Sequence, residues 1–393
     1  MATNTDILIV GGGVIGLTSA YFLARSGCSV IVLEQSADPG RQASWAGAGI
    51  IPPGNPERVT SATEKLRAFS VSEIPSFSET LRELTGIDNG YRRCGGIEIF
   101  TPEEAEIIPS IWRREGIAFE ELNACSLGDI EPELMVPNGS CNRRSESPVS
   151  EQSFRTFRLP GMGQIRNPWH IRAMIRACEL VGVRIIRNHP VTDVVSDGDQ
   201  IEHVRAADRS WTAEKYLFTA GAWTNRLLQE VGHSLPIFPV RGQMVLFKSD
   251  TRLFSSVVII GKRYLVPRED GHVLVGSTEE PEVGFELGNT ESEVESLKTF
   301  AFEWFPTLQS TPIVKCWSGL RPGSQDGFPY LGQLPTVRNG YVAAGHFRAG
   351  LQLSVGTGIL MNELLMGHIP SIDLSPFRPD RSPIAVQMMA FRS

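Results

Sequence analysis

The sequence lacks several features that define common classes of protein. Its 393 residues carry no basic cluster, because arginines gather only in the isolated pairs 92–93, 113–114 and 143–144, and the formal net charge is −7. A nucleic-acid surface is therefore not expected. No apolar run is long enough to span a bilayer, and no cation precedes Arg25. We expect neither an integral membrane segment nor a signal peptide, and a cytoplasmic location.

Cysteine and histidine are also too sparse or too scattered to define a site. The six cysteines are spread along the chain without a CxxC pair. This favours free thiols in a reducing compartment over a disulfide framework or a zinc site. The seven histidines form no Ser/His or His/Asp constellation. We therefore predict no metal ligands and no side-chain general base.

The first informative segment is DILIVGGGVIGLTSAYFLARSGCSVIVLEQ, at residues 6–35. The β-branched run at 7–10 predicts a strand buried on both faces, and residues 17–26 have a helical pattern. A second apolar strand at 29–33 ends at Glu34. The segment therefore predicts a strand–turn–helix–strand unit with a glycine-rich turn.

Each glycine of that turn has a physical use. Gly11 lets the chain turn sharply, Gly13 leaves room for a pyrophosphate near the backbone, and Gly16 lets the helix approach the sheet. The helix N-terminus offers N–H groups and a positive dipole end to the phosphates. Glu34 stands where a carboxylate meets ribose hydroxyls, and an acid there disfavours NADP. The unit predicts a dinucleotide site but leaves NAD and FAD both open.

The later parts of the chain favour FAD. The pattern at residues 239–276 predicts three strands joined by hairpin turns. Such strands indicate an antiparallel sheet. Residues 341–367 form a second strand–glycine–helix junction, without a second nicotinamide fingerprint. One extended cofactor would use both junctions, and a helix N-terminus suits the negative charge of a reduced flavin.

Two other segments carry expectations about local structure. Residues 102–117 have a helical pattern that Pro109 is expected to interrupt. The polar residues 138–157 are read as an exposed insertion.

The segment CWSGLRPGSQDGFPYLG, at residues 316–332, contains one cation, Arg321, and one acid, Asp326. The glycines, prolines and aromatic residues of the rest of the segment predict tight turns and an apolar lining. Arg321 is expected either to grip an anion from a buried position or to form a structural ion pair, for example with Asp326.

Together these motifs resemble the D-amino-acid oxidase-type family of FAD-dependent oxidoreductases, and within it the glycine oxidases of thiamine biosynthesis. The matching segments follow the family order along nearly the whole chain. They are residues 11–16 with Glu34, RQASWAGAGI at 41–50, RYLVPR at 263–268, VGST at 275–278, WSGLRPGSQDGFPYLG at 317–332 and AAGHFRAG at 343–350.

The resemblance implies an α/β (α+β composite) fold. A Rossmann-like FAD-binding domain with a parallel sheet would comprise residues 1–85, 160–235 and 325–375. A substrate-binding domain built on an antiparallel sheet would comprise residues 86–159 and 236–324, followed by a C-terminal tail at 376–393. The resemblance also implies a homo-oligomer, by analogy a tetramer.

The resemblance also assigns roles to residues. Arg321 and Tyr264 would bind the substrate carboxylate, with Arg348 beside the substrate and the flavin. The implied FAD contacts comprise the phosphate and adenosine end, the isoalloxazine segment and the pyrimidine edge. They are Gly11, Gly13, Val14, Ile15, Gly16, Glu34, Gln35, Ala43, Ser44, Ala48, Gly49, Ile50, Val191, Gly221, His346, Phe347, Arg348, Ala349, Gly350, Leu351 and Gln352.

The implied activity is FAD-dependent oxidation of glycine or another small amino acid, such as sarcosine or a small D-amino acid. An imino acid would form and hydrolyse to the oxo acid, and O2 would accept the electrons and yield hydrogen peroxide. Three alternatives stay open. They are a dehydrogenase of the same fold that passes electrons to a quinone, a sarcosine oxidase-like demethylase and a non-catalytic flavin-binding subunit.

This sequence departs from the family pattern at three positions. Lys262 stands where a histidine can occur, and Glu279 where an apolar residue can line the pocket. Glu279 is expected either to hold the substrate ammonium or to face solvent. Cys316 lies near the position where sarcosine oxidases attach flavin, but the wider motif is absent. We therefore expect a small buried apolar role for Cys316 and non-covalent FAD.

Overall fold

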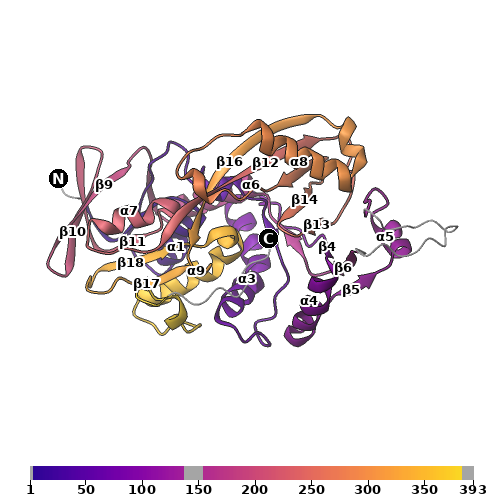
Figure 1. The fold of residues 1–393 in the computed structure, drawn as a ribbon. Helices are drawn as coiled ribbons and strands as arrows, with labels where there is room; N and C mark the ends of the chain where they lie inside the picture. The colour runs from indigo at the N-terminus through magenta and orange to yellow at the C-terminus, as the bar shows by residue number, and fades with distance from the viewer. Residues whose placement is uncertain (1–2, 137–153, 383–393) are drawn as a thin grey trace.

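The computed structural model describes residues 3–136 and 154–382, whose strands form two eight-stranded sheets and a two-stranded one (Figure 1). In Figure 1 the first large sheet occupies the left half, and strands β4, β5 and β6 of the second lie at the right. Chain segments from both ends of the sequence contribute to the first sheet, because β1 pairs with β11 and β11 pairs with β18.

The first sheet contains the predicted strand–turn–helix–strand unit. Strand β1 (Thr3–Val10), helix α1 (Val14–Arg25) and strand β2 (Val30–Leu33) follow in order, and β1 pairs with β2 in parallel. The strand order is β17-β18-β11-β1-β2-β8, and β9 and β10 extend the sheet from β11. The other strands are β8 (Arg184–Ile186), β9 (Val191–Asp197), β10 (Gln200–Ala206), β11 (Arg209–Phe218), β17 (Tyr330–Gln333) and β18 (Gly340–Ala344).

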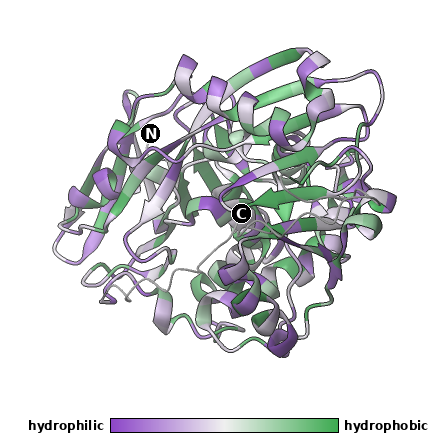
Figure 2. Ribbon diagram, turned by 45° about the vertical axis from the view of Figure 1, so that its right-hand side comes forward, coloured by the Kyte–Doolittle hydropathy of each residue, from purple (hydrophilic) through white to green (hydrophobic). Residues whose placement is uncertain are grey.

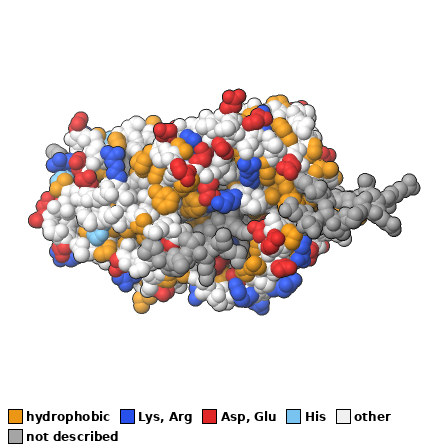
Figure 3. All heavy atoms as spheres, in the orientation of Figure 1, with side chains coloured by type: hydrophobic (Ala, Val, Ile, Leu, Met, Phe, Trp, Pro, Cys, Tyr) orange, Lys and Arg blue, Asp and Glu red, His pale blue; other side chains and the backbone are white. Residues whose placement is uncertain are grey.

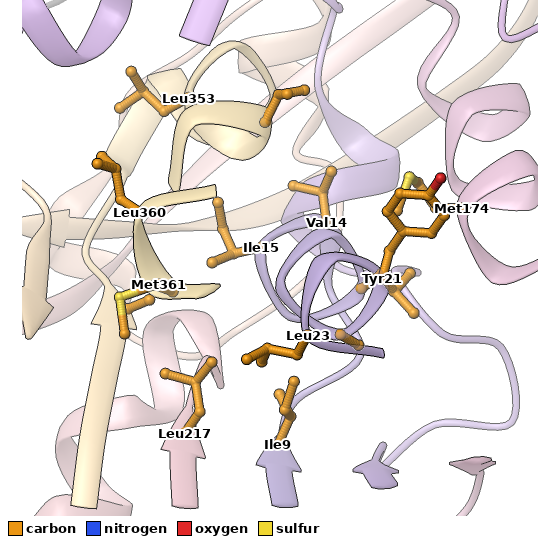
Figure 4. Packing of buried hydrophobic residues seen from close by; sticks show 14 of the residues in the cluster. Ile9, Val14, Ile15, Tyr21, Leu23, Met174, Leu217, Leu353, Leu360 and Met361 are labelled. Carbon is orange, nitrogen blue, oxygen red and sulfur yellow. The ribbon is translucent and has the colours of Figure 1, made fainter. Parts of the chain in front are cut away.

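Helices cover this sheet on one face and bury its side chains in a common core. Helices α1, α3 (Ala62–Thr85), α6 (Asn167–Leu180) and α9 (Gly350–Leu365) contribute to it. Figure 4 shows Ile9 and Leu217 of the strands together with Val14, Leu23, Met174, Leu353 and Leu360 of the helices. A second core on the opposite face includes Leu227 and Leu228 of α7 (Thr224–Gln229). Burial on both faces explains the continuous apolar runs of the strands.

The second sheet has the order β16-β12-β15-β14-β13-β4-β6-β5 and is antiparallel except where β13 pairs with β4. The segment predicted as three strands forms four, because residues 256–268 fold into a hairpin with Gly261 at φ +55° in its turn. The strands are β4 (Gly96–Phe100), β5 (Glu120–Leu122), β6 (Arg155–Leu159), β12 (Ile237–Lys248), β13 (Val257–Ile260), β14 (Arg263–Pro267), β15 (His272–Gly276) and β16 (Ile313–Ser324). The predicted α/β composite is thus the observed fold, but the first sheet is mixed: β8, β2, β1, β11 and β18 pair in parallel, and β9, β10 and β17 join by antiparallel pairing.

Two local predictions are wrong. Helix α4 (Pro102–Glu115) continues through Pro109. Thr101 and Glu104 form a capping box that stabilises its start, and Pro109 lies on the buried face of the helix. Residues 155–157 of the predicted polar insertion belong to β6, where Phe157 is 1% exposed and packs against Phe100 and Trp112. Residues 138–153 of that prediction lie outside the described residues.

Helix α8 (Glu291–Trp304) packs on the second sheet through Leu297, Phe300 and Trp304. Figure 2 shows apolar residues concentrated on the strands of the interior and polar ones on loops and outer helix faces. On the face drawn in Figure 3, basic and acidic side chains are interspersed. No helix within residues 3–136 or 154–382 is both long and apolar enough to cross a membrane.

The two large sheets meet where β16 contacts the short helix α2 (Ala43–Ala46). Trp317 Nε1 donates a hydrogen bond to the carbonyl of Ala46 at 3.1 Å, and its ring meets that of Trp45 edge-on at 5.3 Å. Gly319 is required at this contact, because a Cβ there would lie 2.6 Å from Cβ of Ala46. This contact brings the segment that carries Arg321 next to the glycine-rich loop after β2. The two-stranded sheet, β3 (Ile50–Ile51) with β7 (Gly163–Gln164), lies at the end of the same loop.

Candidate active site

A cavity of about 510 Å³ extends from the β1–α1 turn of the first sheet to β12 and β16 of the second. It brings together most of the residues predicted from sequence. Those that line it are Gly11, Gly13, Val14, Ile15, Glu34, Gln35, Ala43, Ser44, Ala48, Gly49, Ile50, Val191, Gly221, Tyr264, Arg321, His346, Phe347, Arg348, Gly350, Leu351 and Gln352. Gly16, Glu279 and Ala349 do not line it.

The glycines of the β1–α1 turn create space at one end of the cavity. Gly11 has φ +110°, and a Cβ there would lie 2.7 Å from the carbonyl oxygen of Thr219. A Cβ at Gly16 would lie 2.0 Å from the carbonyl oxygen of Gly11. Gly16 therefore acts by allowing close packing of helix and strand, as predicted, although it lies away from the cavity.

Glu34 is buried beside this turn, with 7% exposure. Its Oε2 accepts a hydrogen bond from the N–H of Gly12 at 2.8 Å, and its Oε1 accepts from the N–H of Ser36 at 2.8 Å. These bonds hold the carboxylate at the edge of the cavity, near Val191 at the start of β9.

The loop after β2 is held in place by residues from distant segments. Ser44 Oγ accepts from the N–H of Val14 at 2.9 Å, and Asn167 Nδ2 donates to the carbonyl of Ser44 at 2.7 Å. Arg268 Nη2 donates to the carbonyl of Ala48 at 2.7 Å. Burial lowers the pKa of Arg268 to about 10, and nearby Arg166 acts in the same direction. The loop is thus a fixed wall of the cavity.

The junction between β18 and α9 forms another part of the wall. Burial lowers the pKa of His346 to about 3, so its imidazole is neutral, and Nε2 lies 3.1 Å from Thr357 Oγ1. No side chain of residues 3–136 or 154–382 caps the N-terminus of α9, whose positive dipole end lies beside the cavity. Phe347 has φ +47°, a strained value for a residue with a side chain. Ala349 packs in the core under the helix instead of lining the cavity.

Arg321 lies on β16 at the other end of the cavity, opposite Val240 of β12. The segment predicted as tight turns is a long strand up to Ser324, and this places the guanidinium on a rigid element. Its Nη2 donates to Ser277 Oγ at 2.6 Å, and its Nη1 donates to the carbonyl of Thr278 at 3.1 Å. Burial lowers the pKa of Arg321 below its usual value, yet a guanidinium stays charged in proteins.

The proposed ion pair between Arg321 and Asp326 is wrong. Asp326 instead pairs with Arg381 at 2.9 Å, and the guanidinium of Arg381 also lies over the Tyr330 ring at 3.7 Å. Among residues 3–136 and 154–382, no carboxylate forms an ion pair with Arg321. A cation that lines a cavity without an ion-pair partner is completed by an anionic ligand.

Tyr264 stands beside Arg321 and is 5% exposed. Its hydroxyl donates to Met244 Sδ at 3.4 Å. Tyr264 also raises the pKa of Arg321, which partly offsets the lowering of that pKa by burial. A sulfur atom is a weak acceptor, so the hydroxyl can turn to a better partner at low cost. Arg321 and Tyr264 therefore offer adjacent donors to an anion.

A buried polar network fixes the carbonyl that Arg321 contacts. Thr278 Oγ1 accepts from the N–H of Gln243 at 2.9 Å and donates to Glu280. Glu280 forms an ion pair with Arg241 at 2.6 Å and accepts from Gln243 Nε2. The network spans β12 and the segment after β15. It acts on Arg321 through the carbonyl of Thr278, to which the guanidinium donates.

Arg348 is held away from Arg321 by other partners. Its Nη1 donates to Glu279 at 3.2 Å, and its Nη2 donates to the carbonyl of Lys262 at 2.9 Å. Glu279 also lies 3.5 Å from Lys262 Nζ. The Glu279 side chain is 28% exposed and points to these two cations rather than into the cavity.

Sequence reasoning missed several residues that line the cavity. Most belong to segments outside the recognised motifs, and Arg41, Gln42 and Gly319 lie within motifs whose resemblance gave them no role. They include Arg41, Gln42, Asn167, His189, Thr219, Trp223, Arg226, Gly242, Met244 and Gly319. The asparagine at the start of α6 is the most informative, because Asn167 is 1% exposed and its Oδ1 has no hydrogen-bond partner within the described parts of the chain.

Gly242 provides the surface on which the Arg321 guanidinium rests. A Cβ at this position would lie 2.2 Å from both Nη1 and Nη2 of Arg321. We expect Gly242→Ala to displace the guanidinium and raise the KM for an amino-acid substrate about tenfold to a hundredfold, because a charge-assisted hydrogen bond would be lost. Steady-state kinetics measure this effect, and the flavin absorbance should be unchanged.

Gly128→Ala is a matched control for Gly242→Ala, since a Cβ at Gly128 meets nothing within 4 Å. It should leave KM unchanged. An unchanged KM in Gly242→Ala would show that substrate binding does not require the Arg321 guanidinium to lie against residue 242.

Cys316 lies on the other face of β16 from Arg321. Its side chain packs against the core under α8, and it is absent from the cavity wall. Alternate residues of a strand point to opposite faces, so Cys316, unlike Arg321, faces away from the cavity. Burial raises the pKa of its thiol, which further weakens it as a nucleophile. This position supports non-covalent FAD.

The cavity fits the dinucleotide and the flavin of FAD on three independent observations. The glycine turn leaves backbone exposed beside the start of α1, as a pyrophosphate requires. The buried Asn167 Oδ1 has no hydrogen-bond donor among the described residues and could accept from the cofactor. The N-terminus of α9 lines another part of the cavity. The residues that would hold FAD are those of the β1–α1 turn, Glu34, the loop after β2 and the start of α9. Such a fold and cavity define a flavin-dependent oxidoreductase.

The chain belongs to the family of FAD dependent oxidoreductases, whose model matches residues 6–364. It is 35% identical to glycine oxidase of Pseudomonas putida over 379 residues, which cover 96% of this chain and 99% of the relative. The crystal structure of glycine oxidase from Geobacillus kaustophilus matches with a TM-score of 0.86 at 31% identity, over 96% of this chain and 99% of that one. A solved iminodiacetate oxidase from Chelativorans, at 23% identity and a TM-score of 0.83, shares the fold.

These matches agree with the resemblance identified in the sequence. The protein is an FAD-dependent oxidoreductase that acts on the CH–NH group of amino acids. FAD is its cofactor.

Proposed function

We propose that this enzyme oxidises glycine and other small amino acids, including sarcosine and small D-amino acids, with O2 as the electron acceptor. For glycine the overall reaction is glycine plus water plus O2 to glyoxylate, ammonia and hydrogen peroxide. The observation that carries the proposal is Arg321, a half-buried cavity cation without a carboxylate partner in the described chain. The similarity to glycine oxidases over almost the whole chain supports the choice of substrate.

The proposed division of labour follows from the contacts of each residue. Arg321 and Tyr264 would bind the substrate carboxylate through adjacent donors and so orient the α-carbon toward the cofactor. Bound FAD would accept two electrons from the substrate. No side-chain base is required, since the neutral, buried His346 is engaged with Thr357 and serves only as part of the wall.

Three further parts of the proposal rest on the resemblance. The domain boundaries at residues 85/86, 159/160, 235/236, 324/325 and 375/376 are proposed as stated above. A homo-oligomer and a role in thiamine biosynthesis are proposed in the same way. Four of the cysteines in the described parts of the chain, Cys28, Cys94, Cys178 and Cys316, form no disulfide, which supports a reducing compartment such as the cytoplasm.

The direct test follows the flavin spectrum and the electron acceptor separately. Glycine, sarcosine and D-alanine should each bleach the flavin absorbance under nitrogen, and admission of air should restore it with one hydrogen peroxide formed per substrate. Bleaching without reoxidation by O2, followed by reoxidation with a quinone, would contradict the oxidase and identify the dehydrogenase. No bleaching by any small amine would contradict amino-acid oxidation by this site.

A further inference from the structure

A group of three charged residues lies at the substrate end of the cavity and has no part in the function proposed so far. Lys262 precedes β14, Glu279 follows β15, and Arg348 lies between β18 and α9. The inference drawn from them deepens the proposed function and rests on it, because it concerns which carboxylates the site accepts.

The cavity contains two guanidinium groups with different partners. Arg321 is hydrogen-bonded to a hydroxyl and a carbonyl, and neither carries a charge. Arg348 also lines the cavity, with only 7% of its side chain exposed, but it is paired with Glu279 at 3.2 Å. The two cations therefore differ in whether a carboxylate of the protein already neutralises them.

Two of the three charges, those of Arg348 and Glu279, lie within electrostatic reach of the carboxylate anchor. Burial is the main cause of the lowered pKa of Arg321, Arg348 lowers it further, and Glu279 raises it. Lys262 is a weak partner of Glu279, because its side chain is 75% exposed and its ammonium lies 3.5 Å from the carboxylate. The carboxylate of Glu279 is thus the group that offsets the second guanidinium.

A carboxylate ligand binds best to a guanidinium whose donors are available and whose charge is not already offset. Arg321 meets this condition, and Arg348 does not while Glu279 accepts from its Nη1. A substrate with one carboxylate would use Arg321 alone. A second carboxylate on the substrate would meet Arg348, whose charge Glu279 already offsets, and would be repelled by the negative charge of Glu279.

We propose that Glu279 is a specificity-determining residue, which masks Arg348 and restricts the site to substrates with a single carboxylate. Removal of the Glu279 charge unmasks Arg348 as a second anion anchor. The enzyme then gains affinity for dicarboxylates and for amino acids with two carboxylates, while the anchor at Arg321 is unchanged.

The experiment compares dicarboxylate and monocarboxylate binding to the FAD-loaded enzyme by calorimetry. The ligands are acetate, malonate, succinate and glutarate, because the dicarboxylates differ in the separation of their charges. In Glu279→Gln, the Kd of at least one dicarboxylate should fall about tenfold relative to that of acetate, as expected for one added hydrogen bond between charged groups. Iminodiacetate should show a matching fall in KM relative to glycine. Unchanged ratios in both Glu279→Gln and Glu279→Ala would overturn the proposal.

Two controls separate a local charge effect from a structural one. Glu282→Gln removes an exposed carboxylate three residues away and should leave every ratio unchanged. The double variant Glu279→Gln with Arg348→Met should lose the dicarboxylate gain, because the second anchor is absent. A gain that persists in the double variant would contradict the role of Arg348.

The acetate measurements test the underlying function independently. If acetate binds the unaltered enzyme and Arg321→Met abolishes that binding, the carboxylate anchor stands whatever the result at Glu279. If acetate binding does not depend on Arg321, the proposed function itself fails.

Discussion

Replacement of Arg321 by methionine is expected to raise the KM for glycine about a thousandfold while FAD stays bound. Loss of one partner from a buried, hydrogen-bonded charge pair costs about 4 kcal/mol, which corresponds to that factor. Methionine fills similar space but has no donor for a carboxylate. Steady-state oxygen uptake gives KM, and the flavin absorbance of the purified variant reports the cofactor.

Arg321→Lys is the informative companion to this variant. Lysine keeps the charge but not the planar fork that matches two carboxylate oxygens, so its KM should lie between those of the unaltered enzyme and Arg321→Met. Retention of FAD in both variants would show that the fold is intact. A KM for glycine that does not change in Arg321→Met would refute the carboxylate anchor.

Gly13→Val is expected to give a colourless protein that binds added FAD at least about a hundredfold more weakly. Gly13 caps the start of α1 and lines the cavity, where a Cβ would already lie 3.3 Å from Ser44 Oγ. The branched side chain of valine would occupy the space that the pyrophosphate needs beside the helix N-terminus. Each lost hydrogen bond to a charged group costs about 1.5–3 kcal/mol. Titration of the apoprotein with FAD, followed by flavin fluorescence, measures the affinity.

Gly13→Ala distinguishes loss of cofactor from loss of fold. Gly13 has φ −75°, so a side chain causes no backbone strain there, and a methyl group meets only the one hydroxyl. We expect a smaller loss of affinity in Gly13→Ala and an unchanged circular dichroism spectrum in both apoproteins. A yellow Gly13→Val enzyme with normal affinity would contradict the placement of the pyrophosphate.

The dinucleotide end of the site could be predicted because its residues are close in sequence. Gly11, Gly13, Gly16 and Glu34 act through two strands, one turn and one helix, and the observed unit has these parts in the predicted order. Short-range hydrogen bonds and the period of apolar residues determine such a unit with little help from the rest of the chain.

Other predictions failed where long-range pairing overrode the local pattern. Residues 316–324 look like turns because they contain glycine and proline, yet they form the end of β16, since β12 supplies a partner along its whole length. Pro109 looked like a break in α4, but a capped and amphipathic helix tolerates one missing hydrogen bond. Asp326 looked like a partner for Arg321, but Arg381 from the C-terminal segment reaches it instead.

The role of Glu279 shows the same limit. Glu279 is exposed, as one of its two expected roles has it, but it also pairs with Arg348, which lies 69 residues away in the sequence. Such a partner is set by how β15 and the β18–α9 junction pack together. A single sequence carries no signal of that distance.

The sequence alone determined the class of cofactor, the two kinds of sheet and the cation that we propose to bind the substrate, because these depend on residue types in contiguous motifs. Only the tertiary structure decided which charges remain available in the cavity. Pairing of β12 with β16 places Arg321 over Gly242, away from any carboxylate of the described chain, and the segment after β15 brings Glu279 to Arg348. A charge acquires its function from the groups that neutralise it, and those groups are neighbours in space rather than in sequence.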